Sequence, residues 1–246
     1  MTDPGRWIIR WPAPLTPRLR LLCFPYAGGG ASVYRPWREH LPPDVELCAV
    51  QLPGRESRLS EPPWYQLSAL LPQLHRGLSG LLDLPYATFG HSLGALVSFE
   101  FVRQLRRCGD PLPRHLFASG RGAPQVPVRS EPIHRLPDAE FVREIARFRA
   151  TRPEVLADPD LLELVLPALR ADFALSERYR YRPEPPLPCP ITAFYGIGDP
   201  SVRKDDVSAW GSQTSAAWRV RAMPGDHFFL RPAQPRLLAE IGSSLA

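Results

Sequence analysis

The clearest chemical signal in the sequence is the pentapeptide Gly90-His91-Ser92-Leu93-Gly94. It follows a short apolar run and opens a helical pattern, which is the strand, turn, helix setting of a nucleophile elbow. A serine on so tight a turn sits in a strained backbone conformation, and the two glycines let strand and helix approach closely. We therefore predict that Ser92 is a catalytic nucleophile.

A serine nucleophile needs a general base, and histidine is the usual one. In folds that carry the nucleophile on such an elbow, the serine comes first along the chain, then an acid, then the histidine. Among the six histidines, His134 falls in a long inserted segment, whereas His227 lies just after the last strand-like run. We predict that His227 is the base and that His91, next to the nucleophile, packs beneath the turn.

The orienting acid is expected at the end of a strand, close to the loop of the histidine. Asp199 ends the segment 195–199 directly after a strand-like run, so we predict that it holds His227. Asp226 adjoins the histidine, but neighbouring residues rarely aim at each other's functional atoms. Asp226 and Asp172 stay open as alternatives.

Acyl transfer also requires N–H donors for the tetrahedral oxyanion. The backbone N–H of Leu93, directly after the nucleophile, is one predicted donor. The second should come from the glycine-rich loop 24–30 after the first core strand, and we predict Ala27. A nucleotide-binding interpretation of this loop is weak, because it lacks the G-x-G-x-x-G spacing and a P-loop lysine.

These residues must be positioned by an alternation of strands and helices. Several strand-like runs are apolar along most of their length, as expected for parallel strands covered on both faces. Helical patterns are clearest over 64–82 and 93–108, and the alternation predicts a doubly wound α/β sheet with helices on both faces. The expected strands are Leu19–Phe24, Val45–Val50, Tyr86–Phe89, His115–Ser119, Ile191–Tyr195 and Trp218–Met223.

One segment breaks the alternation, since residues 124–188 contain no convincing strand. Two helical patterns, 138–149 and 158–179, lie in this segment, which is too long for a plain loop. We predict one α/β-hydrolase domain over residues 1–246 with a helical lid inserted at about 124–188. The proline-rich stretch 182–190 is interpreted as the hinge that returns to the sheet.

Composition excludes several chemistries. Lys204 is the only lysine among 30 basic residues and stands in no motif, which argues against a Walker phosphate loop, a pyridoxal Schiff base or a Ser-Lys dyad. The formal net charge of +5 comes from scattered arginines, so we expect no nucleic-acid binding.

The N-terminal 17 residues lack the features of a signal peptide, and no run approaches the ~18 apolar residues of a membrane span. We therefore expect a cytoplasmic protein that does not contact a membrane. The cysteines are widely spaced, so we expect buried, reduced thiols and no metal site. They are Cys23, Cys48, Cys108 and Cys189.

Taken together, these motifs resemble the type II thioesterases that accompany polyketide synthases and nonribosomal peptide synthetases. The resemblance runs from about residue 17 to the C-terminus. The P-Y-A-G-G loop, L-P-G-R-E and G-D-H-F-F-L are together far more selective than G-x-S-x-G alone. The matching segments are 24–29, 52–56, 89–95, 119–124, 195–200 and 225–230.

The resemblance implies a discrete editing enzyme that hydrolyses stalled or aberrant acyl groups from the phosphopantetheine arm of acyl or peptidyl carrier proteins. It implies no cofactor, because the pantetheine arm belongs to the substrate, and we expect a monomer. Two alternatives stay open: a carboxylesterase or lipase of the same fold, and a chain-releasing thioesterase that forms macrocycles. A catalytically dead binding module of this fold is a further alternative from a different class.

Overall fold

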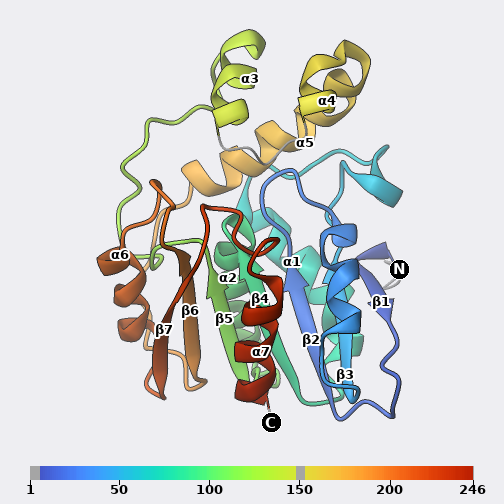
Figure 1. The fold of residues 1–246 in the computed structure, drawn as a ribbon, viewed down its shortest axis with the longest axis vertical. Helices are drawn as coiled ribbons and strands as arrows, with labels where there is room; N and C mark the ends of the chain where they lie inside the picture. Colours follow the sequence, from blue (N-terminus) through green and yellow to red (C-terminus); the bar gives the residue numbers. More distant parts are fainter. Residues whose placement is uncertain (1–5, 148–152, 246) are drawn as a thin grey trace.

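A single sheet of seven strands organises the chain, in a computed structural model that describes residues 6–147 and 153–245 (Figure 1). The strand order is β1-β3-β2-β4-β5-β6-β7, and every neighbouring pair is parallel except β1 and β3. The strands are β1 (Ile8–Trp11), β2 (Leu19–Phe24), β3 (Val45–Val50), β4 (Tyr86–His91), β5 (His115–Ser119), β6 (Ile191–Gly196) and β7 (Trp218–Met223).

The predicted mostly parallel α/β sheet is confirmed, and the central strands are buried along their whole length, as their apolar sequences indicated. Two strands extend slightly beyond their predicted ends, to His91 and Gly196. The sequence analysis missed β1, an antiparallel edge strand of four residues in which only Ile8 is fully buried. So short a segment carries little periodic signal.

Helices cover both faces of the sheet (Figure 1). Residues of η2 and α7 pack on one face, where alternate strand residues such as Leu21 and Phe89 contribute to a common core. Residues of α1, α2, α6 and η5 pack on the other. The elements outside the insertion are α1 (Leu67–Leu78), α2 (Leu93–Cys108), α6 (Lys204–Ser208), α7 (Gln234–Leu245), and the 3-10 helices η2 (Ala31–Glu39), η3 (Glu56–Arg58), η4 (Ser79–Leu81) and η5 (Ala209–Gln213).

Helix boundaries follow local chemistry. Helix α2 has the predicted range and ends at Gly109, whose φ of 75° is the left-handed conformation that favours glycine at a helix C-terminus. The pattern over 64–82 proved too long for one helix, because the chain is extended at Gln66 and tightens into η4 from Ser79.

The inserted segment between β5 and β6 forms three helices, α3 (Asp138–Arg147), α4 (Pro153–Ala157) and α5 (Pro159–Glu177), which lie beyond one end of the sheet in Figure 1. Asp158 begins α5, because its side chain accepts hydrogen bonds from the N–H groups of Asp160 and Leu161. The predicted helix 138–149 is present as far as Arg147, and its last two residues lie outside the described range.

The first part of the proline-rich return segment, residues 182–186, is hydrogen-bonded to α2. Arg103 donates to the carbonyl of Arg182 at 2.5 Å, and Arg106 donates to the carbonyl of Pro185 and to the carboxylate of Glu184, each at 2.6 Å. If the segment acted as the predicted hinge, several of these charge-assisted hydrogen bonds would have to break. In the described part of the chain, no helix is both long and apolar enough to cross a membrane.

Candidate active site

Ser92 occupies the sharp turn between β4 and α2. Its φ of 54° is one of two positive values outside glycine in the described residues, and its N–H donates to the carbonyl oxygen of Ser119 at 2.7 Å. A non-glycine residue in this region costs about 1–3 kcal/mol and persists only where the surroundings impose it. The backbone here is the strained turn that the G-x-S-x-G motif predicted.

The two motif glycines are required by contact between backbones. A Cβ atom added to Gly90 would lie 2.1 Å from the carbonyl oxygen of Gly94, and one added to Gly94 would lie 2.0 Å from the carbonyl oxygen of Phe24. Both distances are far below van der Waals contact. The glycines therefore allow α2 to start directly against β2 and β4, which fixes the position of Ser92.

His227 and Asp199 are joined by a hydrogen bond of 2.7 Å between Nδ1 and Oδ2. The Asp199 side chain is fully buried, whereas His227 keeps 15% of its side chain exposed. Ser201 donates to the other oxygen of Asp199 through both its backbone N–H and its hydroxyl, at 2.9 and 2.6 Å. Burial raises the pKa of the Asp199 carboxyl, but the bonds from His227 and Ser201 outweigh it and leave this pKa below its usual value.

The two alternative acids, Asp226 and Asp172, form hydrogen bonds with residues other than His227. Asp226 accepts a hydrogen bond from the N–H of Phe228, which closes the turn carrying the histidine. Asp172 lies on α5 and pairs with Arg55 at 2.6 Å. Of the three candidate carboxylates, the one next to the His227 ring is therefore Asp199.

The buried ring of His91 packs against the ring of His227. Its Nδ1 is 2.9 Å from the Ser119 hydroxyl, and its ring centroid is 5.2 Å from that of His227. Burial, followed by the charge of His227, lowers the pKa of His91 well below its ordinary value, so this ring stays neutral. The expected packing role beneath the turn agrees with this arrangement.

The order Ser92, Asp199, His227 thus converges at the carboxyl ends of β4, β6 and β7. Among the described residues, no hydrogen bond joins the Ser92 hydroxyl to His227, and catalytic hydrogen bonds often tighten only in the substrate complex. The role of His227 as base toward Ser92 stays a prediction that this arrangement supports.

Both predicted oxyanion donors are free to bind an acceptor. In residues 6–147 and 153–245, neither the N–H of Ala27 nor that of Leu93 donates a hydrogen bond within the protein. Leu93 is the first residue of α2, where a backbone N–H has no partner inside the helix. Their roles as oxyanion donors stay predictions.

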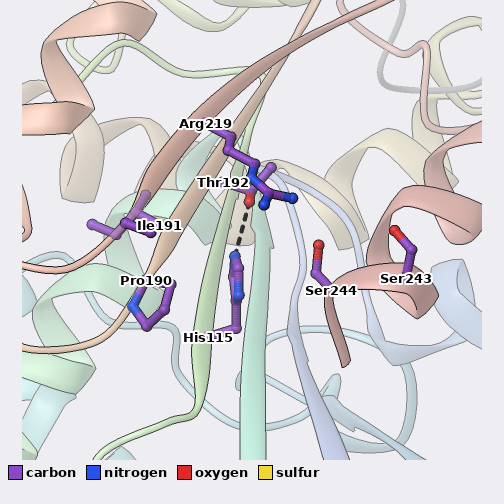
Figure 2. Close-up of a pocket in the computed structure, with 8 residues that line it drawn as sticks. His115, Pro190, Ile191, Thr192, Arg219, Ser243 and Ser244 are labelled. Carbon is purple, nitrogen blue, oxygen red and sulfur yellow. Dashed lines mark hydrogen bonds between the residues drawn. The ribbon is translucent and has the colours of Figure 1, made fainter. Parts of the chain in front are cut away.

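A cavity of about 230 Å³ lies at the opposite edge of the sheet, near the amino ends of β5 and β6. Figure 2 shows His115 in this cavity, bonded to the Thr192 hydroxyl at 2.8 Å, with Arg219, Ser243 and Ser244 nearby. Among its lining residues there is no carboxylate to orient the histidine. None of the predicted catalytic residues, Ser92, Asp199 and His227, lines this cavity.

A different group has the atom types to ligate a metal ion, because ligand atoms of His75, Cys108 and Asp110 lie within 4.8 Å of one another. The Nε2 of His75 and Oδ2 of Asp110 already face each other at 2.7 Å, as in an ordinary surface ion pair. Cys108 is exposed, which contradicts the expectation that all four thiols are buried, because it ends α2 where the helix leaves the sheet. The other three cysteines are buried, and all four are free.

Two contacts near the site were not predicted from the sequence, that of Ser201 with Asp199 and that of Arg55 with Asp172. Ser201 fixes Asp199, and the Asp-Pro-Ser turn could have indicated it, since aspartate side chains commonly accept the N–H two residues later. Asp172 was weighed only as a catalytic acid. Its partner Arg55 is 117 positions away, and no local pattern signals such a contact.

Comparison with known proteins places these features in one family. The thioesterase domain model matches residues 19–245. A protein of Brevibacillus parabrevis named linear gramicidin dehydrogenase LgrE is 43% identical over 246 residues, covering 99% of this chain and 94% of its own length. The structure of the type II thioesterase BorB from the borrelidin biosynthetic cluster is 35% identical, with a TM-score of 0.90 and full coverage of both chains.

A further solved structure is RedJ, a thioesterase from the prodiginine biosynthetic pathway of Streptomyces coelicolor. It is 40% identical, with a TM-score of 0.85, and the match covers 98% of this chain and 87% of RedJ. The resemblance to type II thioesterases that the motifs indicated is confirmed. Because one family model spans the first core strand to the last helix, and relatives above 30% identity match almost the whole length, the chain belongs to the thioesterase domain family of α/β-hydrolase-fold enzymes.

Proposed function

We propose that this protein is a discrete editing thioesterase that hydrolyses aberrant or stalled acyl groups from the phosphopantetheine arm of acyl or peptidyl carrier proteins. The observation that carries the proposal is the His227–Asp199 pair beside the strained Ser92 turn, in a chain of the thioesterase family. The synthase that supplies the carrier would be a polyketide synthase or a nonribosomal peptide synthetase, as the names of the relatives suggest.

In the proposed acylation step, the Ser92 hydroxyl attacks the thioester carbonyl and His227 accepts its proton. The new C–O bond converts the carbonyl oxygen into an oxyanion, which accepts hydrogen bonds from Ala27 and Leu93 N–H. Collapse of the intermediate breaks the C–S bond and releases the pantetheine thiol with the proton from His227. A thiol with a pKa of about 8.5 needs less protonation than an amine leaving group.

Water completes the cycle. His227 removes a proton from the water molecule as its oxygen attacks the acyl carbonyl on Ser92. Collapse of this intermediate breaks the ester C–O bond to Ser92 and releases the acid, and His227 returns the proton to the Ser92 oxygen. Asp199 holds the histidine in the tautomer whose Nε2 can accept a proton, because its carboxylate binds the Nδ1 side. All steps use side chains and backbone N–H groups of the protein and one water molecule. The proposal requires no cofactor, because pantetheine arrives as part of the substrate. We also propose a monomer in the cytoplasm.

The name of LgrE describes a dehydrogenase. The sequence of the present chain does not favour that activity, because the loop after β2 reads P-Y-A-G-G-G-A-S-V and lacks the glycine spacing of a dinucleotide-binding turn. The turn after β4 is occupied by the serine elbow instead. An esterase that shares the triad is the nearer alternative, and it differs in substrate only.

The discriminating experiment is a hydrolysis panel of acyl groups loaded on carrier proteins, followed by intact-protein mass spectrometry. We expect faster release of acid from the carrier thioester than from an oxygen ester of the same acyl group, and Ser92→Ala should reduce both rates about 10⁴-fold or more. A higher rate on the oxygen ester would overturn the thioesterase proposal. A macrocyclic product in place of the free acid would indicate a chain-releasing enzyme.

A further inference from the structure

The L-P-G-R-E segment, residues 52–56, has no role in the triad. It nevertheless contacts the oxyanion loop, residues 25–30, which carries Ala27. The Arg55 side chain donates to the carbonyl of Gly29 at 3.2 Å. The next residue, Glu56, accepts hydrogen bonds from Ser32 just beyond the loop, and its carboxylate occupies the space where a side chain on Gly30 would lie.

Asp172 of the inserted helix α5 binds the same loop from the other side. Its Oδ2 accepts a hydrogen bond from the N–H of Gly28 at 2.7 Å. Gly28 has a φ of 76°, and a Cβ atom there would lie 2.5 Å from the Cδ2 atom of Leu169, one turn earlier on α5. The residue that follows Ala27 is thus held by both the carboxylate and the surface of the helix.

Arg55 and Asp172 form a two-pronged ion pair that links these contacts. Nη1 donates to Oδ2 at 2.6 Å and Nη2 to Oδ1 at 2.9 Å. The two side chains keep only 8% and 1% of their surface exposed, respectively. The Asp172 carboxylate therefore accepts three hydrogen bonds, from two N–H groups of Arg55 and one of the oxyanion loop.

The residue before Ala27 is also fixed. The carbonyl oxygen of Tyr26 accepts from the N–H of Gly29 at 2.9 Å, and its hydroxyl accepts from Arg231 at 2.7 Å. Ala27 is therefore held through both of its neighbours, and its own N–H has no acceptor among the described residues. A donor that is fixed before the reaction stabilises a developing oxyanion without reorganisation.

We propose that Arg55 and Asp172 are positioning residues of the acyl-transfer reaction, which hold the oxyanion loop so that the Ala27 N–H is aimed at the developing oxyanion. This inference rests on the proposed function. It also gives the inserted helix α5 a part in catalysis, because the Asp172 carboxylate of that helix holds the conformation of the oxyanion loop.

The test compares Asp172→Asn with Glu46→Gln, which neutralises one partner of a similarly buried ion pair, Arg20–Glu46, on the sheet. Asp172→Asn removes a charge partner of Arg55, and Glu46→Gln removes one charge partner of Arg20 and of Arg10, so both variants should lose thermal stability. We expect kcat of Asp172→Asn to fall about 10- to 100-fold with KM within about threefold, whereas kcat of Glu46→Gln stays within about twofold. Equal kcat values for the two variants would overturn the proposal.

A second measurement separates positioning from stability. A trifluoromethyl ketone analogue of the acyl thioester forms a tetrahedral adduct with a serine nucleophile and places an oxyanion at the donors. Its inhibition constant should rise for Asp172→Asn in proportion to the loss of kcat, and an unchanged constant would contradict the proposal. If Asp172→Asn does not fold, Arg55→Lys serves in its place, because lysine keeps the charge and loses the two-pronged contact.

Each rate is measured on an acyl-pantetheine thioester and on a p-nitrophenyl ester of the same acyl group, since both reactions need the oxyanion donors. A wild-type protein that cleaves only the oxygen ester would refute the proposed substrate and leave the positioning test intact. Wild-type activity on the thioester, with full kcat retained in the variants, would refute the positioning role alone.

Discussion

The two edges of the sheet each hold a histidine fixed by a neighbouring side chain, but only one edge has the chemistry of an active site. At the carboxyl edge, His227 binds the Asp199 carboxylate beside the Ser92 turn. At the amino edge, His115 lines the cavity of about 230 Å³ and binds the Thr192 hydroxyl (Figure 2). Burial, together with the charge of Arg219, lowers the pKa of His115 to about 4.

A cavity lined by a histidine is not sufficient for a hydrolase site. A general base must accept a proton near neutral pH, and the imidazolium that forms must be stabilised. The carboxylate of Asp199 is placed to supply that stabilisation at one edge, and none of the residues that line the cavity is a carboxylate. Among the changes considered below, removing the Asp199 carboxylate should therefore lower the catalytic activity of the carboxyl edge the most.

The largest effect is expected from Asp199→Asn, which keeps the size of the side chain and removes its charge. The amide can favour the wrong tautomer of His227 and cannot stabilise the imidazolium, so kcat should fall about 10³- to 10⁴-fold. Steady-state hydrolysis of an acyl-pantetheine thioester measures this. Asp226→Asn is the matched control, because the hydrogen bond of the Asp226 carboxylate within the described residues comes from a backbone N–H. A loss as large as that of Asp199→Asn would reassign the acid.

An intermediate effect, on stability, is expected from Gly94→Ala at the carboxyl edge. The new methyl group would meet the carbonyl oxygen of Phe24 at 2.0 Å, and neither backbone can move without shifting the strand. The free energy of unfolding should fall by about 3 kcal/mol. Gly80→Ala is the control before β4, since nothing lies within 4 Å of its added Cβ, and urea unfolding should place it within about 0.5 kcal/mol of wild type. Similar losses for both variants would contradict the backbone contact.

The smallest effect is expected at the amino edge, from His115→Gln. The folded-state pKa of about 4 lies below the unfolded value near 6.5, so between these pH values the unfolded chain binds a proton that the folded chain does not. Wild-type stability should therefore fall as the pH decreases through this window. The variant should lose about 2 kcal/mol less between pH 7 and pH 4.5, with hydrolysis at pH 7 within about twofold of wild type.

Urea unfolding at a series of pH values measures the slopes. His91, whose pKa is also lowered by burial, contributes to both proteins equally and cancels from the difference. Identical slopes for wild type and His115→Gln would show that His115 is not buried as a neutral ring. A large loss of hydrolysis would assign the amino edge a part in the reaction.

Much of the fold could be predicted because its signals are local. The central strands carry continuous apolar runs, which correspond to burial on both faces. The spacing of Gly90 and Gly94 around Ser92 reflects the close contact between the backbones of these two glycines. Asp199 and His227 could be placed because each follows a strand, and the carboxyl ends of parallel strands share one edge.

The features that were missed depend on contacts distant in sequence. Strand β1 is defined by its pairing with β3 rather than by its own four residues. The exposure of Cys108 depends on where α2 leaves the sheet. The pairing of Arg55 with Asp172 joins two segments that have no common pattern, and only the fold brings them together.

The arginine contacts of α2 with the return segment also affect the order in which the site can form. Ser92 begins this helix, whereas Arg103 and Arg106 near its other end bind residues 182–185, close to 80 positions later in the chain. Closing so long a loop carries an entropic cost before its contacts contribute, and high contact order slows folding. We therefore expect Asp199, which follows the return segment, to join the Ser92 turn only after the insertion has closed against α2.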